Sequence, residues 1–214
     1  SWSASKLNYE KKSSLAVYQR QIFRDGLIGE KNEDPNHAGL TIWENKEVRA
    51  WIDTPNADVL ICSFKSKMNT ISPEVLEGIQ QSISIAERNY SGLVIWQTSS
   101  LKLGNPGGPF SAGANLEAAL PLVAKGGFAG IEPFVKQFQD TMMRVKYAYV
   151  PVVCAISGIA LGGGCELVMQ CAKRVAALES YIGLVEVGVG LLPAGGGLKE
   201  AAIRAHHAVK AFGN

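Results

Sequence analysis

Gly158-Ile-Ala-Leu-Gly-Gly-Gly-Cys-Glu166 joins a strand-like run (150–156) to a helix-like run (165–172). Consecutive glycines at such a junction cost backbone entropy, so we expect them to provide close backbone contact or a positive φ. A junction without side chains also presents amide donors to an oxygen atom. Glu166 falls in the first turn of the following helix. It is either a functional acid or a simple complement to the helix dipole.

The rest of the chain alternates strand-like and helix-like patterns, which predicts an α/β architecture. Ser72 and Pro73 mark one helix start, as N-cap and first helical residue. The polar, charge-mixed segment 1–38 is predicted to be a linker or flanking segment, and 39–214 the folded core. Expected strands are 47–53, 58–64, 92–97, 150–156 and 174–177, and expected helices are 73–89, 114–123, 131–147, 165–172 and 198–212.

The amino-acid composition argues against several functions, namely nucleic-acid binding, membrane insertion and metal binding. Of the 214 residues, 47% are hydrophobic and 19% charged, which supports a buried core. The formal net charge of +2 calls for neither a nucleic-acid partner nor an anionic membrane surface. No apolar run is long enough for membrane insertion. The four cysteines form no CxxC pair and lie far from the histidines, so we expect no metal site and a reducing, cytoplasmic location.

Two further segments carry candidate chemistry. Phe110-Ser-Ala-Gly-Ala-Asn-Leu116 enters a predicted helix, and its small residues allow a ligand to approach the main chain. The alternative is an ordinary helix start that contains glycine. Tyr181-Ile-Gly-Leu-Val-Glu-Val-Gly188 places Glu186 among apolar residues, where burial would raise its pKa toward the range of a general acid. The alternative is a solvated loop glutamate.

Other catalytic motifs fail. Pro193 follows Gly188-Val-Gly-Leu-Leu where a dinucleotide fingerprint needs its third glycine, and there is no Walker A sequence. Ser111 does not lie in a GxSxG motif. A serine hydrolase is therefore not expected.

Together these segments resemble the crotonase (enoyl-CoA hydratase/isomerase) family, from about residue 47 onward. The resemblance rests on four stretches in the family's order: Ser66-Lys-Met-Asn-Thr70, Ser-Ala-Gly-Ala at 111–114, Ala160-Leu-Gly-Gly-Gly-Cys-Glu166, and Glu186 ahead of Leu192-Pro-Ala-Gly195. It implies a spiral of ββα units, truncated before the family's C-terminal trimerisation helices. It also implies an acyl-CoA substrate.

The resemblance assigns roles to individual residues. Glu166 and Glu186 match the two catalytic glutamates, and the amides of Ala114 and Gly163 match the oxyanion hole. With both glutamates present, the implied activity is hydration of 2-enoyl-CoA to 3-hydroxyacyl-CoA in fatty-acid β-oxidation. The residues implied to bind substrate and coenzyme A are Lys67, Met68, Asn69, Ala112, Asn115, Leu116 and Gly162.

The resemblance also sets expectations for the complete protein. Hydration needs no cofactor, because coenzyme A is part of the substrate. NAD is expected only for a 3-hydroxyacyl-CoA dehydrogenase part outside this chain, and the complete protein is expected to be a homo-oligomer. Alternatives are an isomerase, another acyl-CoA enzyme on the same scaffold, or a non-catalytic CoA-binding or structural fragment. Asn115 departs from the aspartate that most relatives have.

Overall fold

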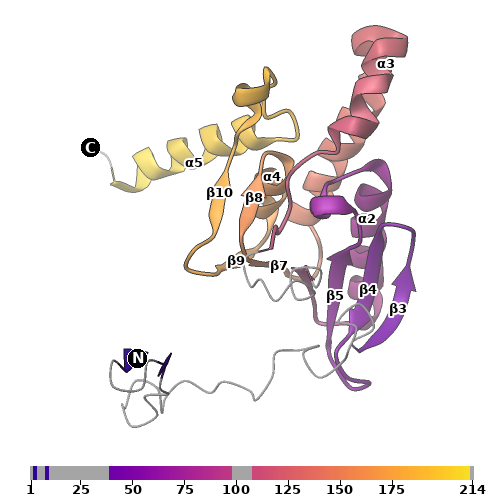
Figure 1. The fold of residues 1–214 in the computed structure, drawn as a ribbon, viewed down its shortest axis with the longest axis vertical. Helices are drawn as coiled ribbons and strands as arrows, with labels where there is room; N and C mark the ends of the chain where they lie inside the picture. The colour runs from indigo at the N-terminus through magenta and orange to yellow at the C-terminus, as the bar shows by residue number, and fades with distance from the viewer. Residues whose placement is uncertain (1, 4–7, 10–38, 98–107, 213–214) are drawn as a thin grey trace.

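The computed structural model describes residues 2–3, 8–9, 39–97 and 108–212. Strands and helices alternate along the chain, as the sequence predicts (Figure 1). The strands are β1 (Trp2–Ser3), β2 (Asn8–Tyr9), β3 (Leu40–Glu44), β4 (Val48–Ile52), β5 (Val59–Phe64), β6 (Gly92–Trp96), β7 (Val152–Ile156), β8 (Ile159–Leu161), β9 (Lys173–Ala176) and β10 (Tyr181–Gly183). The helices are α2 (Pro73–Asn89), α3 (Leu116–Lys146), α4 (Gly163–Gln170) and α5 (Gly197–Phe212), with 3₁₀ helices η2 (Lys67–Asn69) and η4 (Glu186–Val189).

The largest sheet has six strands in the order β3-β4-β5-β6-β7-β9. The β3–β4 and β4–β5 pairs are antiparallel, and the remaining neighbours are parallel. A second, smaller sheet pairs β8 with β10 in parallel. The mixed sheet places the carboxyl ends of β5, β6 and β7 at one edge, because parallel strands run in the same direction.

Successive ββα units add one layer each. Strands β4 and β5 lead to α2, β7 and β8 to α4, and β9 and β10 to α5. Single parallel bridges join Ile71 to Ala114 and Ser111 to Ala160, so the 111–114 segment lies alongside β8. This is the α/β crotonase fold that the resemblance implies.

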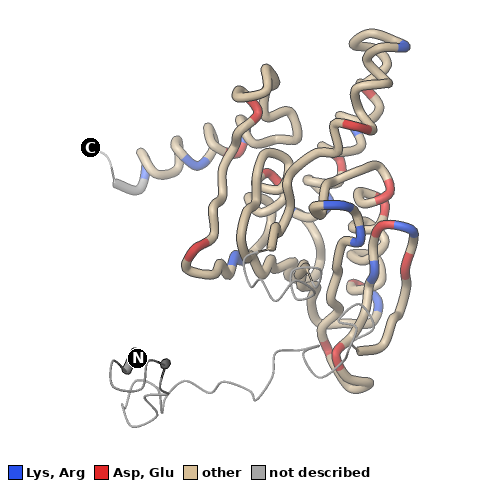
Figure 2. The backbone as a smooth tube through the Cα atoms, in the orientation of Figure 1, with Lys and Arg blue, Asp and Glu red and all other residues tan. Residues whose placement is uncertain are grey.

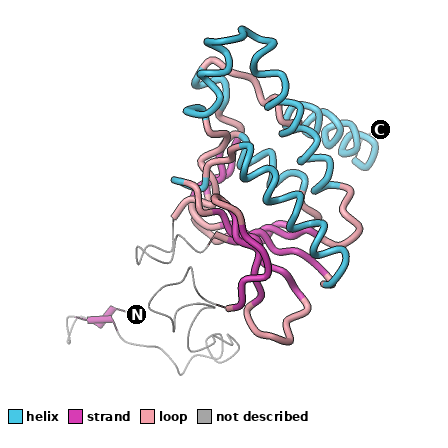
Figure 3. Tube along the Cα trace, turned by 90° about the vertical axis from the view of Figure 1, so that its right-hand side faces the viewer, coloured by secondary structure: helices cyan, strands magenta, loops and turns pink. Residues whose placement is uncertain are grey.

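The core lies on one face of the large sheet, where α2 packs against the strands and α3 packs against α2 and α4 (Figure 3). Helix α2 begins as predicted: the Ser72 side chain accepts a hydrogen bond from the Val75 amide, and Pro73 is the first helical residue. Its apolar side chains recur at helical spacing and are fully buried against the sheet. They are Val75, Leu76, Ile79, Ile83 and Ala86.

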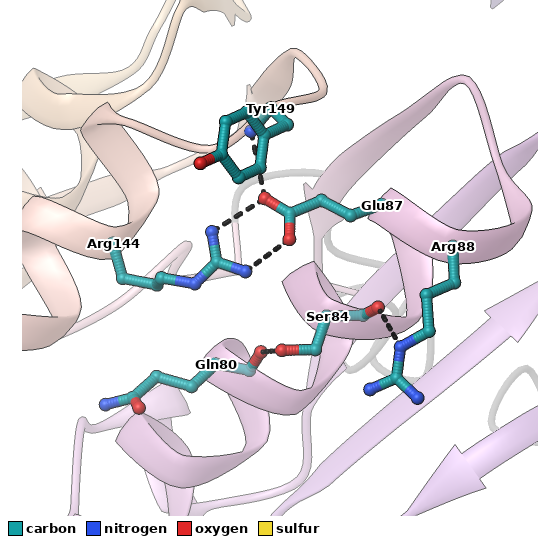
Figure 4. Close-up of polar contacts among 6 residues, drawn as sticks. All are labelled: Gln80, Ser84, Glu87, Arg88, Arg144 and Tyr149. Carbon is teal, nitrogen blue, oxygen red and sulfur yellow. Dashed lines mark hydrogen bonds and ion pairs between the residues drawn. The ribbon is translucent and has the colours of Figure 1, made fainter.

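An ion pair also ties α2 to α3. The Arg144 guanidinium donates to both carboxylate oxygens of Glu87, and the Tyr149 amide donates to the same carboxylate at 2.9 Å (Figure 4). The Arg144 hydrogen bonds hold the pKa of Glu87 below its ordinary value. Arg–carboxylate pairs of this two-pronged geometry are among the stronger surface interactions.

The two helices predicted at 114–123 and 131–147 are present as two helical parts that meet at a kink, with less chain between them than predicted. One element, α3, spans both, and Gly127 interrupts it with φ 59° and ψ −147°. Glycine adopts this conformation without the clash that a Cβ would cause. The two parts of α3 therefore meet at this single break, and the first part extends away from the sheet (Figure 1).

Strands β3, β8 and β10 are not among the predicted elements, whereas the predicted strands and helices in the rest of 39–212 are present within a few residues. Most of the predicted linker at 1–38 lies outside the described residues; within it, β1 and β2 form a short antiparallel pair.

Charged residues of both signs are interspersed along the described chain (Figure 2). Cys62, Cys154, Cys165 and Cys171 are free and buried. Within the described ranges, none of the helices combines the length and apolar character needed to cross a bilayer.

Candidate active site

The three glycines 162–164 are each required by their surroundings. Gly162 has φ 52° and ψ −120°, a conformation that side chains disfavour. A Cβ on Gly163 would lie 3.2 Å from the Ala114 nitrogen, and one on Gly164 would lie 2.8 Å from the Ser111 carbonyl oxygen. The junction therefore needs both a positive φ and close backbone contact, the two reasons expected for glycine here.

The amides of Ala114 and Gly163 lie close together and are available to a ligand. On either side of Ala114, the amides of Gly113 and Asn115 donate within the fold, to Ser111 Oγ and to the Ile71 carbonyl. The Gly162 amide donates to the Gly183 carbonyl at 2.9 Å. Among the described residues, neither the Ala114 nor the Gly163 amide has a hydrogen-bond partner. The fold thus leaves two neighbouring donors free, as an oxyanion hole requires.

Glu166, in the first turn of α4, is 3% exposed. Its Oε1 accepts a hydrogen bond from the Gly197 amide at 2.8 Å. Burial raises the pKa of this carboxyl above its ordinary value, and the nearby charge of Glu186 raises it further, while the Gly197 amide opposes the shift. The protonated and ionised forms are therefore brought closer in free energy at neutral pH, which suits an acid–base catalyst.

Glu186 opens η4, just after β10. Both its carboxylate oxygens are buried, and neither has a hydrogen-bond partner among the described residues. A Cβ on Gly162 would lie 3.4 Å from Glu186 Oε1, so the carboxylate faces the glycine junction. A buried carboxylate without protein donors requires water or substrate to complete its hydrogen bonds.

One cavity of about 260 Å³ brings these groups together. The side chains of Glu166 and Glu186 line it, with Ala114 and Gly163. Most of the remaining wall is apolar, and it includes Ile131, Phe134, Phe138, Val185, Leu191 and Leu192. Small-molecule sites commonly combine such an apolar wall with a few convergent polar groups.

The predicted coenzyme A segment lies beside this cavity. Lys67, Met68 and Asn69 form η2, and none of them lines the cavity. The Met68 carbonyl accepts a hydrogen bond from the Ala112 amide at 3.1 Å, so η2 adjoins the oxyanion loop. Lys67 and Met68 are exposed, whereas Asn69 is 1% exposed and donates from Nδ2 to the Pro109 carbonyl. Asn69 thus holds the start of the loop that leads to Ala114 through its hydrogen bond to Pro109.

The other predicted binding residues also fall into those that line the cavity and one that does not. Ala112, Leu116 and Gly162 line the cavity. Asn115 does not; it is the N-cap of α3, and its Oδ1 accepts a hydrogen bond from the Ala118 amide at 3.1 Å. Asn115 therefore serves the helix start, a role that an aspartate could also perform.

Two features of the site were missed at the level of sequence. Gly197 donates to Glu166, and Phe134 and Phe138 line the cavity from α3. A second glycine triplet, Gly195–Gly197, precedes α5 just as 162–164 precede the body of α4. It was the available signal for a second backbone donor. The two phenylalanines lie one helical turn apart on α3, a spacing that fits any buried helix face.

Two carboxylates with buried oxygens and two free amides meet around an apolar cavity, an arrangement that suits proton transfer next to a carbonyl group. The sequence model of the enoyl-CoA hydratase/isomerase family matches residues 55–209. The chain belongs to this enoyl-CoA hydratase/isomerase, or crotonase, family.

Individual proteins similar to this chain support the same family assignment. A protein of Bacillus subtilis described as a probable 3-hydroxyacyl-CoA dehydrogenase is 44% identical over 143 residues, which cover 67% of this chain and 17% of that protein. The peroxisomal bifunctional enzyme of Cavia porcellus is 34% identical over 145 residues, covering 67% of this chain and 18% of the enzyme. The chain thus spans less than a fifth of either relative.

Solved structures share the fold. The enoyl-CoA hydratase of Bacillus anthracis superimposes with a TM-score of 0.61 at 25% identity, covering 73% of this chain and 57% of that one. Pseudomonas aeruginosa DspI gives a TM-score of 0.62 at 25% identity, covering 74% of this chain and 60% of that one.

Proposed function

We propose that this chain hydrates 2-enoyl-CoA thioesters to 3-hydroxyacyl-CoA. The observation that carries the proposal is the convergence of Glu166, Glu186 and the free amides of Ala114 and Gly163 on one cavity. Water addition requires a base for the water, an acid for carbon and stabilisation of the charge on the thioester oxygen. This cavity contains a group for each task.

The chemistry follows from these groups. The thioester oxygen accepts hydrogen bonds from the Ala114 and Gly163 amides, which withdraws electrons from C3. One carboxylate takes a proton from water as its oxygen bonds to C3, and the C2=C3 electron pair moves toward the carbonyl. The other carboxyl group gives a proton to C2 as the enolate collapses. Each amide donor contributes about 3 kcal/mol to stabilising that charge.

Two carboxylates favour hydration over double-bond migration. Shifting a double bond moves one proton between two carbons, a task that a single carboxylate can perform. Glu186 has two buried oxygens with no protein partner among the described residues, which leaves room for an activated water. Hydration uses both acids and that water.

The coenzyme A portion is proposed to lie along η2 and the 111–116 segment. Lys67 is exposed at this edge and supplies a positive charge for phosphate groups. Asn69 and the Ala112–Met68 hydrogen bond fix the loop that carries the oxyanion donor. Binding and chemistry are thereby coupled through a single loop.

We also propose that the complete protein acts in fatty-acid β-oxidation. The similar Bacillus subtilis protein is named a 3-hydroxyacyl-CoA dehydrogenase, and the Cavia porcellus enzyme is named bifunctional. A dehydrogenase part outside this chain would use NAD to oxidise the 3-hydroxyacyl-CoA made here. A cytoplasmic location and a homo-oligomeric assembly remain part of this proposal.

The test is direct. Adding the complete protein to crotonyl-CoA should lower the ultraviolet absorbance of the conjugated enoyl thioester as water adds. Glu166→Gln and Glu186→Gln should each reduce kcat by on the order of a hundredfold or more. Glu74→Gln, in the first turn of α2, is the matched control and should retain full activity. Unchanged turnover in both active-site variants would exclude this mechanism, and a product with a shifted double bond would indicate an isomerase.

A further inference from the structure

Glu200 is a buried carboxylate outside the cavity. It lies in the first turn of α5, is 3% exposed and does not line the cavity. Its Oε1 pairs with Lys146 at the end of α3 at 2.5 Å, and its Oε2 lies 3.8 Å from Nε of Arg204 on α5. Burying the Glu200 carboxylate has a desolvation cost, while Lys146 stays 28% exposed, so the pair fits a role in fixing geometry better than one in stability alone.

The Lys146–Glu200 pair adjoins the donor to Glu166. Gly197 comes three residues before Glu200, and the Glu200 amide donates to the Gly196 carbonyl at 3.0 Å. The first turn of α5 is therefore continuous from the glycine that holds Glu166 to the carboxylate that Lys146 holds.

A second contact fastens the other side of Gly197. Gln139, also on α3, donates from Nε2 to the Ala194 carbonyl at 2.7 Å. Segment 194–200 is thus tied to α3 both before and after the Gly197 amide. Beyond it, the side chains at 201–210 are exposed, and Arg204 donates a hydrogen bond to the Met169 carbonyl of α4.

We propose that Glu200 is a positioning residue for the proposed hydratase: its ion pair with Lys146 holds the start of α5 so that the Gly197 amide is presented to the Glu166 carboxylate. This inference rests on the proposed function for its catalytic consequence, and on the contacts above for its structural part. Glu200 does not touch substrate. It acts through the backbone of Gly197.

Loss of the Lys146–Glu200 pair should shift the pKa of Glu166 in one direction. The Gly197 hydrogen bond stabilises the ionised form of Glu166 and opposes the rise of its pKa. Weakening that bond removes a donor to the ionised carboxylate and therefore raises the pKa of Glu166 further. Whether Glu166 serves as base or as acid, the limb of the pH–rate profile that it governs moves to higher pH.

A direct effect of these charges on Glu166, without any movement of Gly197, predicts different pKa changes in the two variants. Glu186 is the charged side chain that raises the pKa of Glu166, and Lys146 and Arg204 are those that face Glu200. Removing the negative charge of Glu200 would by field alone lower the pKa of Glu166, and removing the positive charge of Lys146 would raise it. Positioning predicts a rise in both variants.

The experiment compares Glu200→Gln, Lys146→Gln and their double variant with the wild-type complete protein. Infrared difference titration against a Glu166→Gln background reports the protonation of Glu166 without requiring activity. The pH–rate profile with crotonyl-CoA reports its catalytic effect. Glu87→Gln is the matched control, because it breaks an ion pair to α3 at Arg144 that does not reach α5. If Glu200→Gln fails to fold, Glu200→Asp replaces it. Aspartate keeps the charge, so the field alone predicts no change in the pKa of Glu166, whereas the shorter side chain weakens the pair with Lys146 and positioning predicts a rise.

Positioning predicts an upward pKa change for Glu166 in both single variants, no further change in the double variant and none in the control. Opposite changes in the two single variants, or no change in either, would overturn it. A wild-type protein without hydratase activity would refute the proposed function, and the infrared titration would still decide whether Glu200 positions Gly197.

Discussion

Replacing Gly163 by alanine perturbs the proposed oxyanion hole by a single methyl group. The new Cβ would lie 3.2 Å from the Ala114 nitrogen and 2.7 Å from Cζ of Phe138. It would occupy the space between the two amides and force the aromatic ring to move. Loss of one oxyanion donor lowers kcat by about 10²–10³-fold, and overpacking of this kind costs about 1–3 kcal/mol of stability.

Gly78→Ala separates these two effects. A Cβ on Gly78 would lie 2.4 Å from Cγ2 of Val48, so the variant is overpacked between α2 and the sheet, away from the cavity. Steady-state hydration of crotonyl-CoA and urea unfolding should show both variants destabilised and only Gly163→Ala slowed. If Gly163→Ala keeps kcat within about threefold of wild type while losing stability like Gly78→Ala, the Gly163 amide is not an oxyanion donor.

Three further outcomes follow from charges already described. Glu166→Gln should leave the free energy of unfolding at neutral pH unchanged or higher. The pKa of Glu166 is raised in the fold, so burying the ionised carboxylate costs stability once the pH exceeds the pKa of Glu166 in the unfolded chain. A lower urea midpoint would contradict this. Glu87→Gln should cost about 1 kcal/mol at neutral pH, since the lowered pKa of Glu87 contributes stability above its unfolded pKa. The difference from wild type should vanish as pH falls through the lowered, folded-state pKa, and a deficit that persists in acid would point to packing instead. Lys67→Ala should raise KM for crotonyl-CoA and leave kcat unchanged, because Lys67 is exposed beside the cavity and does not line it. A lower kcat with unchanged KM would indicate that Lys67 takes part in the chemical step.

Local signals in the sequence predicted much of this fold. Ser72 and Pro73 marked the start of α2, and the run Gly162–Gly164 marked the junction that carries both a free amide and Glu166. These features depend on residues next to one another in the chain, so a pattern records them. The family resemblance then paired Glu166 with Glu186, which the structure places on the same cavity.

Features that depend on distant partners were not predictable in this way. Strands β8 and β10 have three residues each and pair with one another, and β8 also forms a bridge with Ser111, so neither is long enough to carry a strand pattern of its own. The Gly197 amide meets Glu166 across 31 residues. The helical turns at 124–130 around the kink at Gly127 were not predicted, because the glycines at 126, 127 and 130 favour a loop in sequence.

A crystal structure of the complete protein with acetoacetyl-CoA tests the central assignment most directly. The account predicts the thioester oxygen within hydrogen-bond distance of the Ala114 and Gly163 nitrogens, with the acyl carbons between the carboxylates of Glu166 and Glu186. A thioester bound elsewhere, or either carboxylate turned to bulk solvent in the bound state, would contradict it.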